Sequence, residues 1–132
     1  MVYKKYYKAV FALKCHIAEE TSKVPFSDWQ KIDLRTAKIL GVEDIEGADK
    51  LYKLSIDLGK ELGKRTLVAG IKQHYTKEQL KGKTIIVFTN LEPRKLKGIE
   101  SQGMLLAAVS SDEKDVFLLQ PEKDIELGSR VR

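Results

Sequence analysis

Cysteine and histidine are scarce in this sequence. Its 132 residues include one cysteine, Cys15, and two histidines, His16 and His74. A single cysteine excludes a disulfide within the chain. Zinc sites need a cluster of ligands, and the neighbouring side chains of Cys15 and His16 diverge too far to share an ion or to act as a catalytic pair. We therefore expect no metal site and no cofactor.

Long hydrophobic runs are also lacking. Residues 103–109 form one of the longest, far below the roughly 20 apolar residues that cross a bilayer. The opening residues 1–6 do not lead into the uninterrupted apolar stretch of a secretory signal. We expect a cytoplasmic protein.

Signatures of catalysis are missing as well, since no nucleophile is recognisable beside a base. Residues 59–64 begin with glycine and end in Gly-Lys, but the spacing is one residue short of a phosphate-binding loop and no Ser or Thr follows Lys64. The acidic residues Asp44, Glu46 and Asp49 lack the glycine and distal glutamate of a calcium loop. These segments predict a hairpin turn and a solvated loop in a non-catalytic protein.

The chain is long enough for one globular domain, and its charge is unevenly distributed. It carries 24 basic and 19 acidic residues, a net charge of +5, and residues 1–27 contribute +3 through five lysines and two glutamates. In this segment apolar residues recur at helical spacing, with lysines between them. The apolar residues are Tyr3, Tyr6, Tyr7, Val10, Phe11, Leu13 and Ile17.

This pattern predicts an amphipathic N-terminal helix. We favour packing of the helix on its own domain or on a second copy over a basic arm that touches phosphates or a membrane surface. Residues 21–27 are typical of a linker, because Pro25 ends any helix. Ser27 or Asp28 is then available to cap one short turn.

From Trp29 onward the hydrophobic period becomes that of β-strands. The alternation slips by one residue between Leu34 and Ala37, as at a β-bulge. Thr76 and Gln79 have the spacing of a capping box, which predicts a short helix that Gly82 ends. The predicted strands are residues 32–39, 51–58, 65–69, 84–89 and 104–109.

Five strands without βαβ alternation predict an all-β, five-stranded OB barrel, and a small β-sandwich is the alternative. The connection 90–103 is too polar and too rich in glycine and proline for regular structure. Residues 110–132 predict extra strands that close the barrel or form an oligomer contact. The expected division is a helical extension and linker at 1–27, the barrel at 28–110 and a C-terminal extension at 111–132.

A nucleic-acid surface is the best-supported kind of site. OB barrels bind polynucleotides on the second and third strands and on the loops beside them. Cations at the corresponding positions are Lys38, Lys50, Lys53, Arg65 and Lys72 near the sheet and Arg94, Lys95 and Lys97 in the connection 90–103. Asn90, Ser101 and Gln102 add neutral hydrogen-bonding groups. On charge alone, a merely solvated face is an equal alternative.

Three motifs stand in the order in which they occur in a known family. They are Asp33-Leu34-Arg35-x-Ala37-Lys38-Ile39, Ala48-Asp49-Lys50-Leu51-Tyr52, and Asn90-Leu91-x-Pro93-Arg94-Lys95-Leu96-Lys97-Gly98-x-x-Ser101-x-Gly103-Met104-Leu105-Leu106-Ala107-Ala108. Together they resemble the tRNA-binding domain that occurs in many methionyl-tRNA synthetases, as their separate β subunit, and as stand-alone tRNA-binding proteins. The resemblance runs from Trp29 to Arg132 and leaves residues 1–28 outside.

The resemblance implies an OB barrel whose C-terminal extension forms a homodimer. It also implies a non-catalytic module that binds the tRNA elbow by shape and assists a synthetase, above all a methionyl-tRNA synthetase as its β subunit. The residues that would face tRNA are Lys53, Arg65, Asn90, Arg94, Lys95, Lys97, Ser101, Gln102 and Met104. Cations would pair with phosphates, neutral polar groups with sugar or base edges, and Met104 would give an apolar contact.

Two positions depart from the family pattern. Many members have Val-Gly where this chain has Thr36-Ala37, and an acidic residue is frequent at Gln102. Neither departure removes a cation. A related branch with the same barrel acts as a protein-binding export chaperone, which is the alternative function, but its members lack the Gly-Met-Leu-Leu-Ala-Ala segment present here at residues 103–108.

Overall fold

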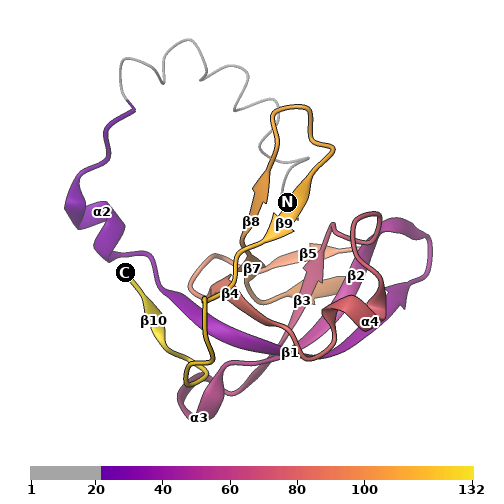
Figure 1. Ribbon diagram of the computed structural model, residues 1–132, viewed down its shortest axis with the longest axis horizontal. Coiled ribbons are helices and arrows are strands. Elements are labelled where there is room, and N and C mark those ends of the chain that lie inside the picture. The colour runs from indigo at the N-terminus through magenta and orange to yellow at the C-terminus, as the bar shows by residue number, and fades with distance from the viewer. Residues whose placement is uncertain (1–21) are drawn as a thin grey trace.

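Strands are the main regular structure of the computed structural model, which describes residues 22–132. The predicted N-terminal amphipathic helix therefore lies outside the described residues. In chain order the elements are α2 (Phe26–Gln30), β1 (Leu34–Ile45), β2 (Ala48–Asp57), α3 (Gly59–Leu62), β3 (Lys64–Ala69), α4 (Lys77–Leu80), β4 (Thr84–Phe88), β5 (Arg94–Leu96), β6 (Ile99–Ser101), β7 (Met104–Leu105), β8 (Ala107–Val109), β9 (Val116–Leu118) and β10 (Arg130–Val131). The predicted all-β, barrel-like fold is confirmed (Figure 1).

Strand β1 is the centre of one antiparallel sheet with the order β3-β2-β1-β4-β7. Residues 34–38 of β1 pair with β4, and residues 38–45 pair with β2. The register with β2 shifts between Ile39 and Gly41, which bends the strand just after it leaves β4. Because β1 exchanges one partner for another along its length, the sheet curls towards a barrel.

The bulge predicted between Leu34 and Ala37 is not present, because β1 pairs with β4 in unbroken register along this stretch. The sequence pattern slips there because Thr36 and Ala37, which point to opposite faces, are both buried. Ala37 belongs to the main core, whereas the C-terminal segment covers Thr36. The Thr36 hydroxyl donates to the carbonyl of Glu126 and accepts from the amide of Ser129, each at 3.0 Å.

The main core lies inside the barrel. Its largest fully buried side chains include Ile39 of β1, Leu54 and Ile56 of β2, Leu67 of β3 and Ile85 of β4. Alternate residues of β2 point inwards, as the period of two in the sequence predicts. Each such side chain contributes roughly 1.5–3 kcal/mol to folding through its burial.

Side chains complete the seam between β3 and the segment that precedes β7. The backbone amide of Gln102 donates to the carbonyl of Thr66, and the Gln102 Oε1 atom accepts from the amide of Thr66, both at 2.9 Å. The Ser101 hydroxyl accepts from the amide of Val68 at 3.0 Å and donates to the carbonyl of Gly103 at 3.0 Å. Two polar side chains thus satisfy backbone groups that a strand ladder would otherwise pair.

The connection 90–103 contains regular structure, so the prediction of an irregular loop was wrong. Strands β5 and β6 pair through Arg94 with Ser101, Lys95 with Glu100, and Leu96 with Ile99. The two turn residues have positive φ, 52° at Lys97 and 80° at Gly98. That combination gives a type I′ turn, whose twist suits a tight hairpin, although lysine rarely adopts it.

Other local predictions have mixed outcomes. The capping box of Thr76 and Gln79 is confirmed at the start of α4. Helix α2 forms one short turn as expected, but Pro25 is its N-cap and no side chain caps it, so the prediction of Ser27 or Asp28 as cap was wrong. The predicted fifth strand is divided into β7, which pairs with β4, and β8, which pairs with β9.

The C-terminal segment adds strands, as predicted. Strand β9 pairs with β8 to form a hairpin that projects from the barrel, and β10 pairs with the first residues of β1 (Figure 1). Gly128 has a φ of +83°, and a Cβ atom there would lie 2.4 Å from the carbonyl oxygen of Leu58. The close approach of this segment to the end of β2 therefore requires glycine.

Candidate nucleic-acid interface

The hairpin of β5 and β6, residues 94–101, carries the densest group of predicted tRNA-facing residues, and we name it the basic hairpin. Alternation divides its two faces. Leu96 and Ile99 turn towards the sheet, where they pack on Ile45, Ala48 and Val68 in a second, smaller core. This apolar contact anchors the basic hairpin on the outer face of β2 and β3.

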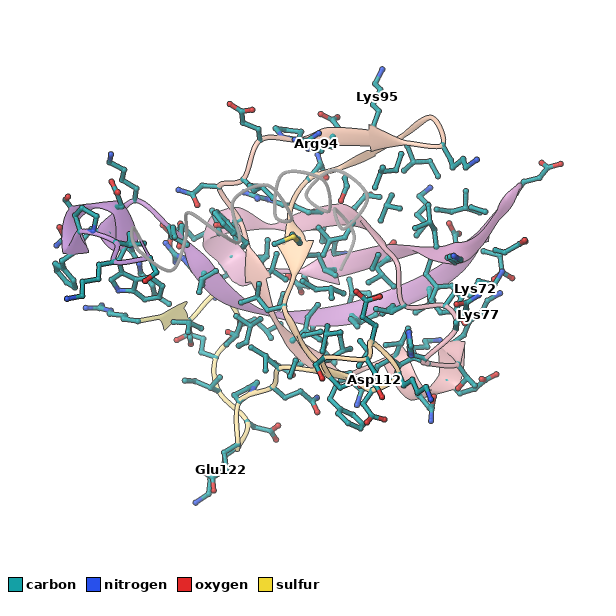
Figure 2. The ribbon with its side chains drawn as sticks, turned by 90° about the horizontal axis from the view of Figure 1, so that it is seen from above. Lys72, Lys77, Arg94, Lys95, Asp112 and Glu122 are labelled. Carbon is teal, nitrogen blue, oxygen red and sulfur yellow. The ribbon has the colours of Figure 1, made fainter. Side chains whose placement is uncertain are left out.

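Lys95 and Lys97 are exposed at the far side of the basic hairpin. Figure 2 shows Lys95 pointing away from the barrel. Glu100 stands directly across from Lys95 in the strand pairing, and this carboxylate reduces the local positive potential. Arg94 is half-buried at the start of β5.

Lys53 and Arg65, the two predicted contacts on the sheet, lie on opposite faces. Lys53 pairs with Val68, so it is on the outer face beside the anchor of the basic hairpin. Its Nζ atom is 3.6 Å from Glu43, and 38% of its side chain is exposed. Arg65 pairs with Ile56 of the main core, so it is on the inner face, at one end of the barrel.

The Arg65 guanidinium is bonded to protein backbone. Its Nη1 atom donates to the carbonyl of Thr89 at 2.7 Å and to the carbonyl of Gln102 at 3.2 Å. Thr89 directly follows β4, and Gln102 directly follows β6. One side chain therefore joins the two ends of the segment that contains the basic hairpin.

The neutral residues of the predicted site also bond within the protein. Asn90 accepts from the amide of Asp33 at 2.8 Å and donates to the carbonyl of Lys31 at 2.6 Å. Ser101 is fully buried, and its hydroxyl is used in the seam with β3 described above. Gln102 is exposed, but its side-chain oxygen accepts from Thr66. Met104 is half-buried against the main core.

Acidic partners that the sequence reasoning overlooked neutralise part of the surface near α4. Lys72 and Lys77 approach Asp44 to 3.0 and 2.6 Å and gather at one edge of the molecule in Figure 2. A hydrogen bond from Lys77 is the main cause that lowers the pKa of Asp44, and a hydrogen bond from Lys72 is the second. The bond between Lys77 and Asp44 also raises the pKa of Lys77. Lys72 is therefore a poorer candidate for phosphate contact than the cations of the basic hairpin.

The first family motif is largely structural. The side chain of Arg35 donates to Asp33 at 2.7 Å and to the carbonyl of Gly128 at 3.0 Å, which fastens the C-terminal segment to β1. The hydrogen bond from Arg35 is the main cause that lowers the pKa of Asp33, against the opposing effect of burial. The same hydrogen bond raises the pKa of Arg35.

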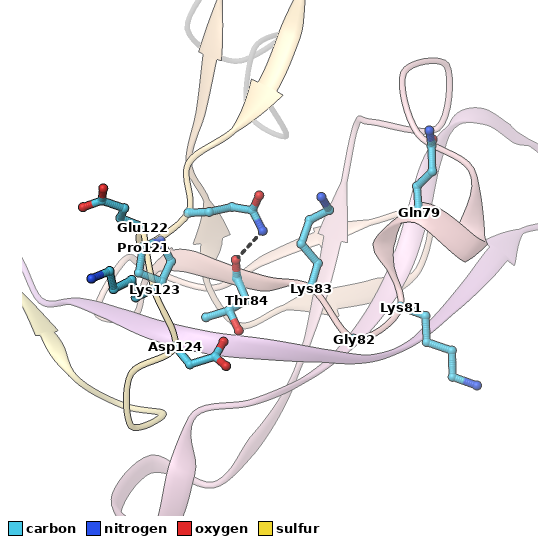
Figure 3. A pocket seen from close by; sticks show the side chains of 10 residues that line it. Gln79, Lys81, Gly82, Lys83, Thr84, Pro121, Glu122, Lys123 and Asp124 are labelled. Atoms are coloured by element: carbon cyan, nitrogen blue, oxygen red, sulfur yellow. Dashed lines mark hydrogen bonds between the residues drawn. The ribbon is translucent and has the colours of Figure 1, made fainter.

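A depression of about 400 Å³ lies between Gln79 and residues 81–84 on one side and residues 120–124 on the other (Figure 3). Cations and carboxylates both line it, among them Lys81, Lys83, Glu122 and Asp124. Glu122 and Lys95 occupy opposite ends of the view in Figure 2. Within residues 22–132 there is no group of three or more potential metal ligands and no helix long and apolar enough to cross a membrane.

Comparison with known proteins identifies the family of this chain. The family profile described as "Putative tRNA binding domain" matches residues 34–130. The chain thus belongs to the tRNA-binding domain family. The matched range runs from the start of β1 to the first residue of β10 and therefore includes the whole basic hairpin.

Curated relatives are much longer than this chain. A methionine–tRNA ligase of Pyrococcus horikoshii is 48% identical over all 132 residues, which cover 18% of that ligase. The corresponding ligase of Pyrococcus abyssi is 52% identical over 109 residues, 83% of this chain and 14% of the ligase. Similarity to the first ligase extends through residues 1–28, which the family resemblance in the sequence had left outside.

The solved structures that resemble this chain include proteins with different titles. A protein titled MetRS-related, from Pyrococcus horikoshii, is 35% identical with a TM-score of 0.77, and the match covers 83% of this chain and 98% of the other. The chaperone CsaA of Bacillus anthracis is 30% identical with a TM-score of 0.75, and the match covers 83% of this chain and 99% of the chaperone. The fold alone therefore does not separate the two functions.

Proposed function

We propose that this chain is a non-catalytic tRNA-binding module that assists an aminoacyl-tRNA synthetase, above all a methionyl-tRNA synthetase. The observation that carries the proposal is the basic hairpin on the outer face of β2 and β3, in a member of the tRNA-binding domain family. It exposes Lys95 and Lys97 and begins with the half-buried Arg94. The strand order β3-β2-β1-β4-β7 supports an OB-type barrel.

Binding would rest on phosphate contacts. The hairpin cations lie on a short, two-stranded element, and Lys53 extends the positive surface onto the sheet. Contacts to phosphates orient a nucleic acid but carry no sequence information. Recognition of the tRNA elbow by shape, with little sequence preference, is the mode that such a surface supports.

The partner and the location of the module are parts of the same proposal. Ligases for methionine contain a segment similar to all of this chain or to 83% of it, so the module would act either within such an enzyme or as a β subunit beside it, in the cytoplasm. In both arrangements it would raise the effective concentration of tRNA near the catalytic domain of the ligase.

Self-association into a homodimer is supported by apolar side chains on the projecting hairpin of β8 and β9. Phe117 is 63% exposed, and Val109 and Leu119 are each 43% exposed. Large apolar side chains left exposed on a projecting element are typical of protein contacts. We propose that a second copy covers them.

A protein-binding chaperone is the second candidate, because the chaperone CsaA has a similar fold. In this chain, the exposed apolar residues of the β8–β9 hairpin could hold an unfolded polypeptide. A competition experiment separates the candidates. Labelled tRNA is bound to the protein, and unlabelled bulk tRNA or a denatured protein is added. Displacement by tRNA alone supports the proposed function, whereas displacement by the denatured protein alone supports the chaperone.

A second experiment tests the synthetase partner. The tagged chain is recovered from its own cells, and co-purified proteins and RNA are identified. Recovery of methionyl-tRNA synthetase with tRNA supports the full proposal. Recovery of tRNA without any synthetase would retain tRNA binding and contradict the accessory role.

A further inference from the structure

We infer that Arg65 is a positioning residue that clamps the basic hairpin at its base, and that it does not itself pair with a tRNA phosphate. The inference rests on the proposed tRNA-binding function for the consequence of the clamp. The clamp itself is a property of the free protein. The inference changes the role of Arg65, the one cation of the predicted site that faces the inside of the barrel, from a phosphate contact to a positioning residue.

The geometry of Arg65 is that of a bridge between two chain segments. A single nitrogen, Nη1, donates to Thr89 at 2.7 Å and to Gln102 at 3.2 Å. These carbonyls belong to residues on either side of the basic hairpin, 13 positions apart in the chain. Hydrogen bonds from a charged donor are stronger than neutral ones, and here they fix where the hairpin leaves and rejoins the barrel.

Neighbouring contacts act at the same base. Gln102 pairs with Thr66 through both its backbone amide and its side-chain oxygen, and the Ser101 hydroxyl bonds the amide of Val68. All these partners are on β3, the strand that carries Arg65. The base is therefore held by hydrogen bonds, and the middle of the hairpin by the apolar contact of Leu96 and Ile99.

This arrangement divides the predicted tRNA-facing residues into two groups. Arg65, Asn90, Ser101 and Gln102 bond protein backbone around the base of the hairpin, whereas Lys95 and Lys97 are exposed on it. A hairpin that is already fixed loses less conformational entropy when tRNA binds. Arg65 would therefore strengthen binding without being one of the ion pairs that make it.

The test compares Arg65→Met with two variants that also remove one positive charge. Lys64→Met is the control on the same strand, and Lys95→Met removes a proposed phosphate contact. Amide hydrogen exchange of residues 94–101 is measured in the free protein. The affinity for unmodified bulk tRNA is then measured at several salt concentrations.

The clamp predicts that Arg65→Met accelerates exchange in the basic hairpin by about tenfold or more, because a charged hydrogen bond is lost, and that Lys64→Met and Lys95→Met leave it unchanged. It also predicts that Arg65→Met weakens tRNA binding severalfold at every salt concentration with the slope of log affinity against log salt unchanged. Lys95→Met should reduce the magnitude of that slope by about 0.7 to 0.9.

Unchanged exchange together with a slope reduced by about 0.7 to 0.9 in Arg65→Met would overturn the inference and make Arg65 a phosphate contact. Absence of tRNA binding by the wild-type chain would overturn the proposed function, and the exchange comparison would still decide the clamp. If Arg65→Met does not fold, Arg65→Lys replaces it. Faster amide exchange in the hairpin, with the salt dependence of tRNA binding equal to that of the wild type, then supports the clamp. Unchanged exchange contradicts it.

Discussion

Two hairpins are attached to the same barrel and differ mainly in where they place their apolar side chains. The basic hairpin of β5 and β6 turns Leu96 and Ile99 onto the sheet and leaves lysines outside. The hairpin of β8 and β9 leaves Phe117 63% exposed, and its turn carries Asp112, Glu113 and Asp115. Under the proposed function, the same secondary structure would supply a surface for RNA phosphates in one place and a surface for another protein in the other.

The acidic turn sharpens this difference. Asp112 accepts from the hydroxyl of Ser110 at 2.6 Å and from the amide of Lys114 at 3.1 Å. The bond from Ser110 is the first cause that lowers the pKa of Asp112, so this carboxylate remains charged in mildly acidic solution. A fixed negative charge at the end of the β8–β9 hairpin would repel RNA phosphates and direct them to the other hairpin.

The largest expected effect follows from removing the charge of the basic hairpin. Replacing Arg94, Lys95 and Lys97 together by alanine should weaken tRNA binding by roughly tenfold to a hundredfold and reduce the salt slope by about 2 to 3. Replacing Lys81, Lys83 and Lys123, which line the depression away from the hairpin, removes the same charge and serves as the control. Equal losses in both triple variants would show that only net charge matters.

A smaller effect is expected from the other hairpin. Phe117→Asp places a charge in the proposed contact between copies, so sedimentation should show a shift from dimer to monomer. Because the side chain is 63% exposed in the single chain, the monomer formed by the variant should still fold. The tRNA affinity should fall only because the monomer lacks the second binding site that the other copy supplies in a dimer. A monomeric wild-type chain would contradict the proposed use of this hairpin.

Acid should affect the C-terminal segment before it affects the basic hairpin. The pKa of Asp33 is below its ordinary value of 3.8, chiefly because Arg35 donates to it. A lowered native pKa means that this stabilisation is complete above about pH 4 and is lost as the pH falls through the native value. Amide exchange near residues 126–131 should therefore rise at low pH in the wild type, and Asp33→Asn should show the faster exchange already at pH 7.

The smallest effect concerns Glu100, which faces Lys95 across the strand pair. Glu100→Gln removes a negative charge from the basic hairpin while keeping a side chain of the same shape. The tRNA affinity should rise about twofold to fivefold at low salt, and the gain should shrink as salt increases. Weaker binding by this variant would place the phosphates elsewhere.

The barrel strands follow from the sequence because one face of each strand meets the main core and produces a clear period of two. The basic hairpin does not, because each of its strands has three residues and its turn needs positive φ at Lys97, a residue that seldom signals such a turn. Leu96 and Ile99 flank the turn residues Lys97 and Gly98, and both face the same apolar patch. That pair of apolar residues was a signal in the sequence for this hairpin.

The candidate site is predictable in composition but not in geometry. Sequence places Arg65 next to Thr66 and Lys64 without showing that it pairs with Ile56 of the core and reaches two carbonyls more than 20 residues away. Register is a property of the folded sheet, and it decides which face a cation occupies. The burial of the Ser101 hydroxyl could not be predicted either, because it also depends on how the folded strands lie against each other.

The most direct test of the central claim is an NMR titration of the labelled chain with bulk tRNA at low salt. The account predicts that amide signals of residues 94–101 and of the outer face of β2 and β3 shift or broaden first, with those of 107–118 and of the depression at 79–84 and 120–124 unchanged. Perturbation confined to the β8–β9 hairpin or to that depression, with the basic hairpin unaffected, would contradict it.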